Sequence, residues 1–352
     1  MKETIGFGIV GCGVISPWHA GSILKVSDAK LVAVCDIIKD KAETLAANHG
    51  SPKVYMDYEQ MLRDPEVDAV CVCTPSGMHA DMGILAAKAG KHILTEKPID
   101  IRLPKIDELI RTARECGVKL AVIFQRRTSS LWQTIARIVA SGALGKMVLG
   151  DAYLKYFRSQ EYYDSGDWRG TWALDGGGAL MNQGVHCVDL LQWVMGPVES
   201  VFAHADHLVR HIEVEDTAVA ALKFRNGAFG VIEGTTSVCP GMNHRLEFHG
   251  EKGTIAVDGE TVVHWDMPDD TPDITGDTGT KAGVDIKLGS AASSPTSIAM
   301  EGHRILIADL VAAIKEDRDP LITGEEARKS VEMILGIYES ARTGRPVRFP
   351  LS

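Results

Sequence analysis

The first 124 residues alternate short apolar runs with segments of helical periodicity. Apolar runs of this length, bounded by Gly, Pro, Asp or Ser, are typical of buried strands, and the longer segments between them are typical of helices. The expected strands are residues 5–10, 31–36, 54–55, 69–73, 93–95 and 119–124, and the expected helices are residues 39–49, 58–63, 80–89 and 104–116. Strands that alternate with helices in this way predict an α/β domain with a doubly wound parallel sheet.

After residue 127 the pattern changes to longer strands in which apolar and polar residues alternate. A helix is expected at residues 131–141, followed by strands at 147–157, 198–206, 215–224, 228–238, 245–248 and 254–257, and by helices at 303–316 and 325–343. Asn226-Gly227 stands between two of these strands and is a strong hairpin signal. Residues 125–352 are therefore expected to form an α+β domain with a large, mostly antiparallel, open-faced sheet, following the domain of residues 1–124.

The open face of such a sheet needs a cover. Another subunit commonly supplies it, so the chain is expected to form a homodimer or homotetramer. Residues 268–296 are rich in Asp, Gly, Ser, Thr and Pro and are expected to form a lid or a mobile loop. That segment is the alternative cover, which requires no second subunit.

Composition and charge restrict the class of protein. A chain of 352 residues with 45% hydrophobic residues and a mean hydropathy near zero is expected to be globular with two domains. No membrane span or secretory signal is expected, and most of the seven cysteines fall in apolar patterns, which together indicate the cytoplasm. The formal charge of -10 argues against nucleic acid or an anionic membrane as partner. Cys71 and Cys73 fall within one strand, so no metal site is expected.

A glycine-rich turn follows the first expected strand. Its residues are Gly11, Cys12, Gly13, Val14, Ile15 and Ser16. The first glycine permits a tight turn, the second lets the backbone approach a pyrophosphate at a helix N-terminus, and a small third residue keeps helix and strand close. Asp36 ends the second strand, where a carboxylate accepts hydrogen bonds from a ribose and repels a 2′-phosphate. Because the next residue is Ile37 and not an arginine, NAD is expected as the cofactor in preference to NADP.

The fourth strand ends in a turn that is expected to line the nucleotide. Thr74, Pro75 and Ser76 form this turn. His79 follows them and is equally compatible with the nicotinamide site and with a helix cap or a surface position.

Glu96, Lys97 and Pro98 follow the fifth strand. The residue before a proline is driven toward extended geometry, so Lys97 is expected at the carboxyl end of the strand, where open α/β sheets bind ligands. Lys97 is a candidate general base if burial and a cationic nicotinamide lower its pKa. Glu96 is expected to position the cofactor or the lysine. A solvated Glu-Lys pair is the alternative interpretation.

The densest group of candidate side chains lies between residues 168 and 189, beginning with Trp168 and Arg169. The apolar stripe after three consecutive glycines consists of Cys187, Leu190, Leu191, Val194 and Met195. It predicts an amphipathic helix. Asn182, His186 and Asp189 are expected on a different face of that helix, pointing at a substrate. A buried histidine bonded to Asp189, and simple packing of the Trp-Arg stretch, are the alternatives.

These motifs, in this order and spacing, resemble the glucose-fructose oxidoreductase/inositol dehydrogenase (Gfo/Idh/MocA) family. The resemblance covers nearly the whole chain and rests on Gly11-Cys12-Gly13, Asp36, Thr74-Pro75, Glu96-Lys97-Pro98 and the helix that carries His186. It implies an N-terminal Rossmann domain, a catalytic Lys97, and a helix with an aspartate and a histidine four residues apart. His186 is then a second candidate base, or a donor to the same oxygen. Asn182 stands where many members have the aspartate, and because an amide cannot accept a proton, an orienting role is expected for it.

A narrower resemblance is to bacterial UDP-N-acetylglucosaminuronate 3-dehydrogenases of the WlbA type. It rests on residues 125–127, 160–163, 168–172 and 179–183. It implies NAD-dependent oxidation of a secondary hydroxyl of a sugar or sugar nucleotide. The substrate-binding residues implied are Asn182, Gln183, Arg126, Arg169, Tyr163 and Asp189. The residues added to the cofactor site are Gln125, Trp168 and Arg169.

Local arginines are the expected means of binding an anionic substrate to this acidic chain. Arg126, Arg127, Arg158 and Arg169 offer the fork geometry that carboxylates and diphosphates require. Internal salt bridges, or contacts with a cofactor phosphate, are the alternative. Other functions on this fold are a dehydrogenase of inositol, a free sugar or a glycoside, an NAD-dependent glycosidase, and a non-catalytic NAD-sensing protein. Product analysis distinguishes these functions. A dehydrogenase forms net NADH, a glycosidase releases an aglycone, and a sensing protein forms neither product.

Overall fold

The computed structural model describes residues 2–268 and 300–351. The chain divides into two compact units, Met1–Gln125 with Met300–Arg328, and Arg126–Ala299 with Lys329–Ser352. The predicted lid at residues 268–296 lies outside the described residues except for Pro268. Across the described ranges, every helix is too short or too polar to cross a membrane.

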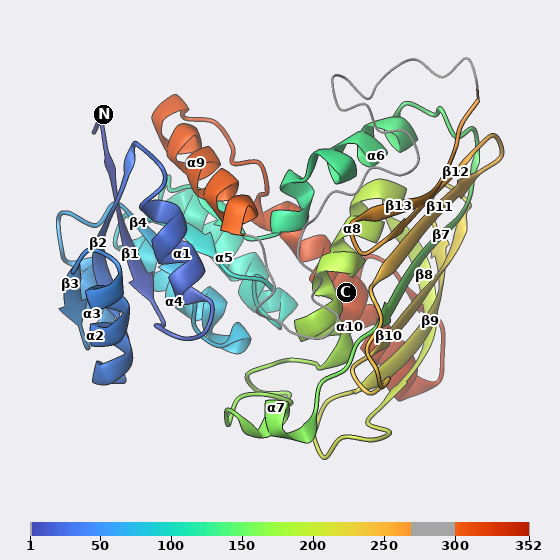
Figure 1. Cartoon of the computed structure of the whole chain (residues 1–352), viewed down its shortest axis with the longest axis horizontal. Helices are drawn as coiled ribbons and strands as arrows, with labels where there is room; N and C mark the ends of the chain where they lie inside the picture. Colours follow the sequence, from blue (N-terminus) through green and yellow to red (C-terminus); the bar gives the residue numbers. More distant parts are fainter. Residues whose placement is uncertain (1, 269–299, 352) are drawn as a thin grey trace. The chain divides into compact units, whose positions relative to one another are not determined.

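The first unit contains a six-stranded parallel sheet with the order β3-β2-β1-β4-β5-β6 (Figure 1). Its strands are β1 (Ile5–Val10), β2 (Ala29–Cys35), β3 (Lys53–Tyr55), β4 (Ala69–Val72), β5 (His92–Thr95) and β6 (Leu120–Val122). Its helices include α1 (Ser16–Ile23), α2 (Lys39–Asn48), α3 (Tyr58–Leu62), α4 (His79–Lys88) and α5 (Leu103–Glu115). The chain changes direction across the sheet between β1 and β4, the switch point at which doubly wound sheets bind ligands. The predicted fold class is confirmed.

Helix α5 shows how the sequence builds this unit. Ile106, Leu109, Ile110 and Ala113 recur at helical spacing and are all buried. Pro104 stands in the first turn of the helix, where a missing backbone N–H leaves no hydrogen bond unmade. Strands β1 and β4 are buried along their whole length, as expected for a parallel sheet with helices on both faces.

Helix α9 (Met300–Glu316) groups with the first unit, whereas the sequence-based division assigned it to the second domain. It packs against α1 and contacts β5. Lys315 Nζ donates to Asp28 at 2.8 Å, and the backbone N–H of Val122 in β6 donates to the carbonyl of Ile322 at 3.1 Å. Helix α9 therefore belongs to the helical layer on the parallel sheet, and the chain that follows it bonds to the edge strand β6.

The second unit contains an eight-stranded sheet with the order β13-β12-β11-β7-β10-β9-β8-β14. Its strands are β7 (Met147–Lys155), β8 (Val198–Asp206), β9 (Thr217–Phe224), β10 (Phe229–Thr235), β11 (Arg245–Gly250), β12 (Thr254–Asp258), β13 (Thr261–Asp266) and β14 (Val347–Arg348). All neighbours pair antiparallel except β7 and β10, which are parallel. The predicted hairpin joins β9 to β10, with Gly227 at a φ of 92°. The outer strands β13 and β14 were not predicted.

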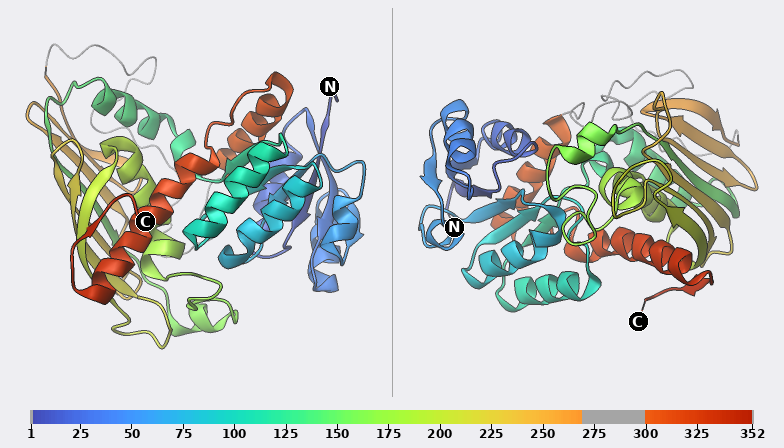
Figure 2. Two further views of the ribbon diagram at one scale, coloured as in Figure 1. Left: turned by 180° about the vertical axis from the view of Figure 1, so that it is seen from behind. Right: turned by 90° about the horizontal axis from the view of Figure 1, so that it is seen from below.

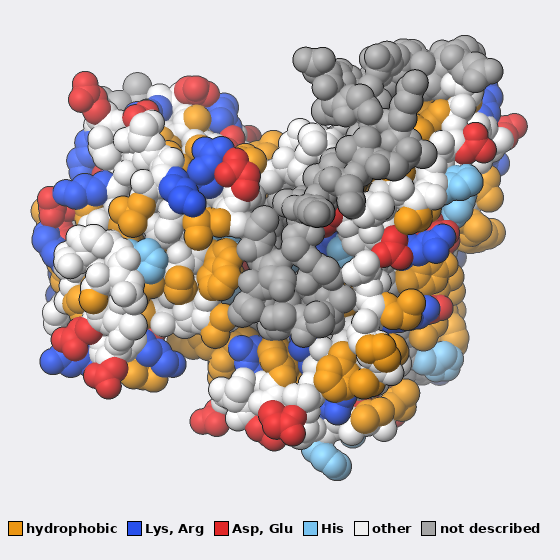
Figure 3. Space-filling model, viewed as in Figure 1, with side chains coloured by type: hydrophobic (Ala, Val, Ile, Leu, Met, Phe, Trp, Pro, Cys, Tyr) orange, Lys and Arg blue, Asp and Glu red, His pale blue; other side chains and the backbone are white. Residues whose placement is uncertain are grey.

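Helices cover one face of this sheet (Figure 2). Helix α8 (Val185–Met195) contacts β7 and β11, and α6 (Ser130–Ala140) packs on α8. Ser340 Oγ, on α10 (Gly324–Thr343), accepts a hydrogen bond from the backbone of Ala203 in β8 at 3.0 Å. The other face exposes large apolar side chains, and hydrophobic side chains appear along this side of the unit in Figure 3. By exposure and strand register, the exposed apolar side chains of this face include Leu149, Phe202, Val219 and Phe229.

Candidate functional site

The glycine-rich turn lies between β1 and α1, as predicted. Gly11 has a φ of 88°, and a Cβ there would meet the carbonyl oxygen of Cys73 at 2.6 Å, so the position requires glycine. A Cβ on Gly13 would meet no described atom within 4 Å, which leaves its backbone open to a ligand. Ser16 Oγ donates to the carbonyl of Gly13 at 2.8 Å and holds the turn against α1. The arrangement fits a pyrophosphate at a helix N-terminus.

The carboxylate of Asp36 lies beside this turn. It accepts hydrogen bonds from the backbone N–H groups of Cys12 at 2.7 Å and Ile38 at 2.8 Å. Asp36 is half-buried, while the side chain of Ile37 is exposed. An anchored carboxylate with no neighbouring guanidinium on its own loop suits a ribose diol and disfavours a 2′-phosphate.

The turn after β4 is joined to the turn after β5 by His79, the first residue of α4. The ring is buried, with Nδ1 at 2.6 Å from the carbonyl oxygen of Pro98 and Nε2 at 2.8 Å from that of Thr74. His79 therefore braces two loops of the cofactor edge. Thr74 Oγ1 is buried and has no hydrogen-bond partner among the described residues, which fits a polar cofactor group at this turn.

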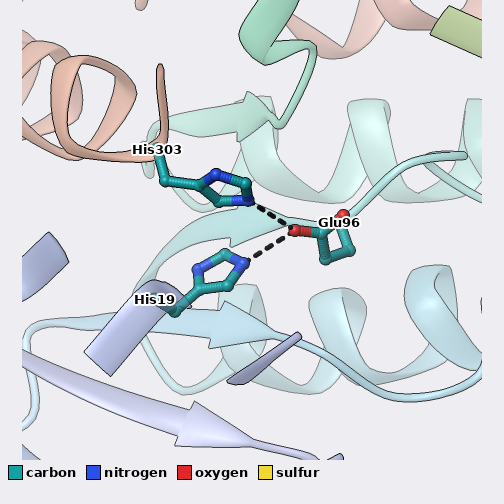
Figure 4. A group of neighbouring side chains, drawn as sticks. All are labelled: His19, Glu96 and His303. Carbon is teal, nitrogen blue, oxygen red and sulfur yellow. Dashed lines mark hydrogen bonds and ion pairs between the residues drawn. The ribbon is translucent and has the colours of Figure 1, made fainter. Parts of the chain in front are cut away.

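Glu96 and Lys97 follow β5 directly, and the Lys97–Pro98 peptide is cis. Glu96 Oε1 lies 2.8 Å from His19 Nε2 and 3.3 Å from His303 Nε2 (Figure 4). Glu96 Oε2 accepts a hydrogen bond from the backbone of Lys97 at 3.2 Å. Burial alone would raise the pKa of Glu96, but the hydrogen bonds from the two histidines outweigh it and hold the pKa well below its usual range. Lys97 is half-buried.

No pattern in the sequence predicts the two histidines that contact Glu96. His19 lies on α1 and His303 on α9, so neither stands near the Glu-Lys-Pro motif in the sequence. His19 lies on the buried side of α1 with Ala20 and Ile23, but the sequence of this helix does not indicate which side chain His19 contacts. Only the packing of α1 and α9 at the end of β5 brings them together.

In the second unit, the helix predicted for residues 182–189 begins with a π-helical turn (Ala179–Gly184), and α8 follows it. The wider turn changes the angular phase between Asn182 and His186 from the one expected for a continuous α-helix. Asn182 donates its amide to Asp175. Asp189 accepts two hydrogen bonds from Arg127, at 2.8 and 2.7 Å, and both side chains are buried. His186 lies in the first turn of α8 with only 9% of its surface exposed.

Glu215 anchors the glycine run before the π-helical turn. Its carboxylate accepts hydrogen bonds from the backbone of Gly178 at 2.9 Å and Leu180 at 2.8 Å, and from the Tyr338 hydroxyl at 2.8 Å. Burial raises the pKa of Glu215 to about 7 despite these bonds. A side chain at position 177 would collide with the Tyr338 hydroxyl, so this position has room only for glycine.

A connected group of polar side chains follows from Asn182. Gln183 Nε2 donates to Asn182 Oδ1 at 3.0 Å and to the Tyr162 hydroxyl at 2.8 Å, and Gln183 Oε1 accepts from Arg158 Nε at 3.0 Å. Arg169 donates to the same Tyr162 hydroxyl at 2.6 Å. We call Arg158, Tyr162, Arg169, Asn182 and Gln183 the amide–arginine cluster. The structure thus brings together Asn182, Gln183 and Arg169, as expected, and adds Tyr162.

Aromatic rings hold the Arg169 guanidinium. It lies 4.4 Å from the ring centroid of Tyr162 and 4.6 Å from that of Trp168. Burial, and the positive charge of Arg169, lower the pKa of Arg158. Two guanidinium groups close enough to repel each other favour an anion beside them.

The remaining arginines and Tyr163 have internal partners. Arg126 Nη1 lies 2.8 Å from Glu260 Oε1 and 2.5 Å from His244 Nε2, and Arg127 pairs with Asp189 as described above. The Tyr163 hydroxyl is buried 2.8 Å from Thr236 Oγ1. For Arg126 and Arg127 the alternative of internal salt bridges therefore describes the structure, whereas Arg158 and Arg169 belong to the amide–arginine cluster.

Known proteins resemble the chain along its whole length. Residues 5–124 match the oxidoreductase family with an NAD-binding Rossmann fold, and residues 132–256 match the GFO/IDH/MocA C-terminal domain. The WlbA dehydrogenase of Bordetella pertussis, solved with NADH and UDP-GlcNAcA, is 34% identical with a TM-score of 0.88, covering 99% of this chain and 100% of that one. The WlbA dehydrogenase of Chromobacterium violaceum, with the same ligands, is 32% identical with a TM-score of 0.87, covering 100% and 98%.

An inositol dehydrogenase is also similar to this chain. Myo-inositol 2-dehydrogenase of Thermotoga maritima is 32% identical over 272 residues, which span 73% of this chain and 76% of that protein. The matches agree with the Rossmann fold of the first unit and with the fold of the chain as a whole. The protein uses NAD, and this chain belongs to the GFO/IDH/MocA family of oxidoreductases.

Proposed function

We propose that the protein oxidises a secondary hydroxyl of an anionic sugar nucleotide, of the kind represented by UDP-N-acetylglucosaminuronate, with NAD as the hydride acceptor. The observation that carries the proposal is the amide–arginine cluster. Its guanidinium groups suit a carboxylate or a diphosphate, and its amides suit sugar hydroxyls. Two solved relatives that match along the whole chain hold UDP-GlcNAcA, a ligand with both kinds of anionic group.

In this proposal Lys97 takes the proton of the reacting hydroxyl, and bound NAD supplies the acceptor for the hydride. Lys97 follows the strand end at which doubly wound sheets bind ligands. His186 is the alternative base. Asn182 holds the sugar but cannot relay a proton, because its amide has no basic site and its N–H group is engaged by Asp175.

The deciding experiment measures NADH formation with UDP-N-acetylglucosaminuronate, UDP-N-acetylglucosamine, myo-inositol and free glucose as substrates. The proposal expects the uronate to have the highest kcat/KM, and Arg169→Met to raise the KM of the uronate by a larger factor than the Kd of NAD. A preference for myo-inositol would move the function to the inositol dehydrogenases, to which the chain is also similar. Release of an aglycone without net NADH, or no turnover with the whole panel, would contradict the proposal.

The proposed specificity for NAD rests on Asp36. Asp36→Ala removes the ribose acceptor and the charge that repels a 2′-phosphate, so NAD affinity should fall about ten- to hundredfold, the worth of a charge-assisted hydrogen bond. Asp36→Asn keeps an acceptor without the charge, so it should mainly narrow the preference for NAD over NADP. Both affinities are measured by calorimetric titration. Tighter binding of NADP than of NAD by the unaltered protein would refute the assignment.

We also propose that the exposed face of the eight-stranded sheet is covered by a second copy of the chain. Exposed apolar side chains on neighbouring strands, Phe229 on β10 and Val219 on β9, lie on this face. Light scattering at micromolar concentration should report a dimer or tetramer, and Phe229→Glu should shift it toward the monomer. Leu321→Glu, at an exposed leucine of the first unit, is the matched control and should leave assembly unchanged. A monomeric unaltered protein would contradict the proposal.

A further inference from the structure

A buried group of three titratable side chains, His19, Glu96 and His303, takes no proton in the proposed reaction (Figure 4). The side chains are 0%, 7% and 1% exposed, so water screens little of any charge they carry. They come from α1, the end of β5 and α9. Both imidazoles direct Nε2 at the same oxygen of Glu96, at 2.8 and 3.3 Å.

The hydrogen bonds indicate which member of this group carries charge. Glu96 is reached by three N–H donors, the two imidazoles and the backbone of Lys97, and a carboxylate with that many donors is held ionised. Nδ1 of His19 and Nδ1 of His303 are buried without a partner in the described part of the chain. A hydrogen on either Nδ1 would be a buried donor with no acceptor among the described residues, and this geometry favours rings that carry their hydrogen on Nε2. The group therefore has a net charge of about one negative unit.

The same atoms disfavour a metal ion in this cluster. A histidine that binds a metal through Nε2 carries its hydrogen on Nδ1 and donates it to a second acceptor. Neither Nδ1 has such an acceptor among the described residues. The Nε2 atoms are better explained as donors to Glu96 than as metal ligands.

The negative charge of Glu96 lies at the edge of the sheet where the cofactor is expected to bind. Glu96 follows β5 at the carboxyl edge of the parallel sheet, the edge at which the Gly11 turn follows β1 and Thr74 follows β4. The nicotinamide ring is cationic in NAD and neutral in NADH, so a fixed negative charge at this edge interacts differently with the two forms. We propose that the His19–Glu96–His303 group holds a negative charge that makes the protein bind oxidised NAD more tightly, relative to NADH, than it otherwise would. This goes beyond the proposed function, because it holds whatever the substrate is.

The test measures the Kd of NAD and the Kd of NADH by calorimetry for the unaltered protein and for Glu96→Gln. The substitution removes the charge and keeps the shape, so Kd(NADH)/Kd(NAD) should fall on the order of tenfold, the effect of one buried unit charge at moderate range. Glu59→Gln removes an exposed charge from the same unit and should leave the ratio unchanged. Equal changes in both affinities for Glu96→Gln would overturn the proposal.

Two variants of His303 keep the proposal testable if Glu96→Gln does not fold. A glutamine amide can still donate a hydrogen bond to Glu96, so His303→Gln should keep the ratio. His303→Leu removes that donor, makes the carboxylate easier to protonate, and should lower the ratio severalfold. An unchanged ratio in folded His303→Leu would contradict the proposal. So would stoichiometric zinc in the purified protein that is lost in His303→Leu, because a metal would neutralise the charge.

Discussion

Lys97→Met should lower turnover by about two to four orders of magnitude on the best substrate while leaving the Kd of NAD nearly unchanged. General acid–base catalysis typically contributes that factor, and methionine keeps the length and apolar stem of lysine without its proton-accepting nitrogen. Steady-state kinetics give the turnover, and calorimetry gives the NAD affinity. Lys88→Met changes an exposed lysine of the same unit and should retain full activity.

The companion substitution His186→Asn separates the two candidate bases. A loss comparable with that of Lys97→Met would mean that the histidine shares the hydroxyl proton, whereas a small loss would leave it a packing role in α8. Near-normal turnover of Lys97→Met would remove Lys97 from the mechanism and leave His186 as the base. Retained catalysis in both variants would refute the proposed proton transfer but not the family membership.

Arg127→Met should destabilise the protein by about 3–5 kcal/mol, the cost of leaving a buried carboxylate without its partner. The side chains of Arg127 and Asp189 are 5% and 1% exposed, and the guanidinium also lies 5.1 Å from the ring centroid of Trp193. Because Asp189 and His186 share α8, activity should fall together with stability. Urea unfolding followed by circular dichroism measures the change in the free energy of unfolding.

The control for this prediction is an exposed ion pair. Arg63 and Glu59, with side chains 74% and 65% exposed, form an i,i+4 pair on the surface, and Arg63→Met should cost less than about 1 kcal/mol. The double variant Arg127→Met/Asp189→Leu should recover part of the lost stability, because it removes the uncompensated charge as well. A loss below about 1 kcal/mol for Arg127→Met would show that water or another cation compensates Asp189.

Local patterns in the sequence are sufficient for much of the first unit. Short apolar runs between helical segments identify the strands of a parallel sheet, because burial on both faces requires continuous apolar runs. Gly11 can be recognised as part of a nucleotide-binding turn, because its left-handed φ and its close approach to Cys73 exclude a side chain. Asp36 can be recognised as the candidate ribose acceptor, because it ends the next strand. Asn226-Gly227 identifies the β9–β10 hairpin for the same kind of local conformational reason. These features depend on the residue itself and on its immediate neighbours.

Tertiary structure decided which polar side chains meet. His19 and Glu96 are 77 residues apart, and Glu96 and His303 are 207 apart, so no spacing rule connects them. Sequence alone could not distinguish Arg127, which a buried aspartate neutralises, from Arg169, which lies between aromatic rings. The π-helical turn likewise could not be read from the sequence, because it follows a glycine held by Glu215, a residue 37 positions away that Tyr338 also contacts. Apolar periodicity reports only that a side chain is buried, whereas its charge state and role depend on the atoms that distant segments bring to it.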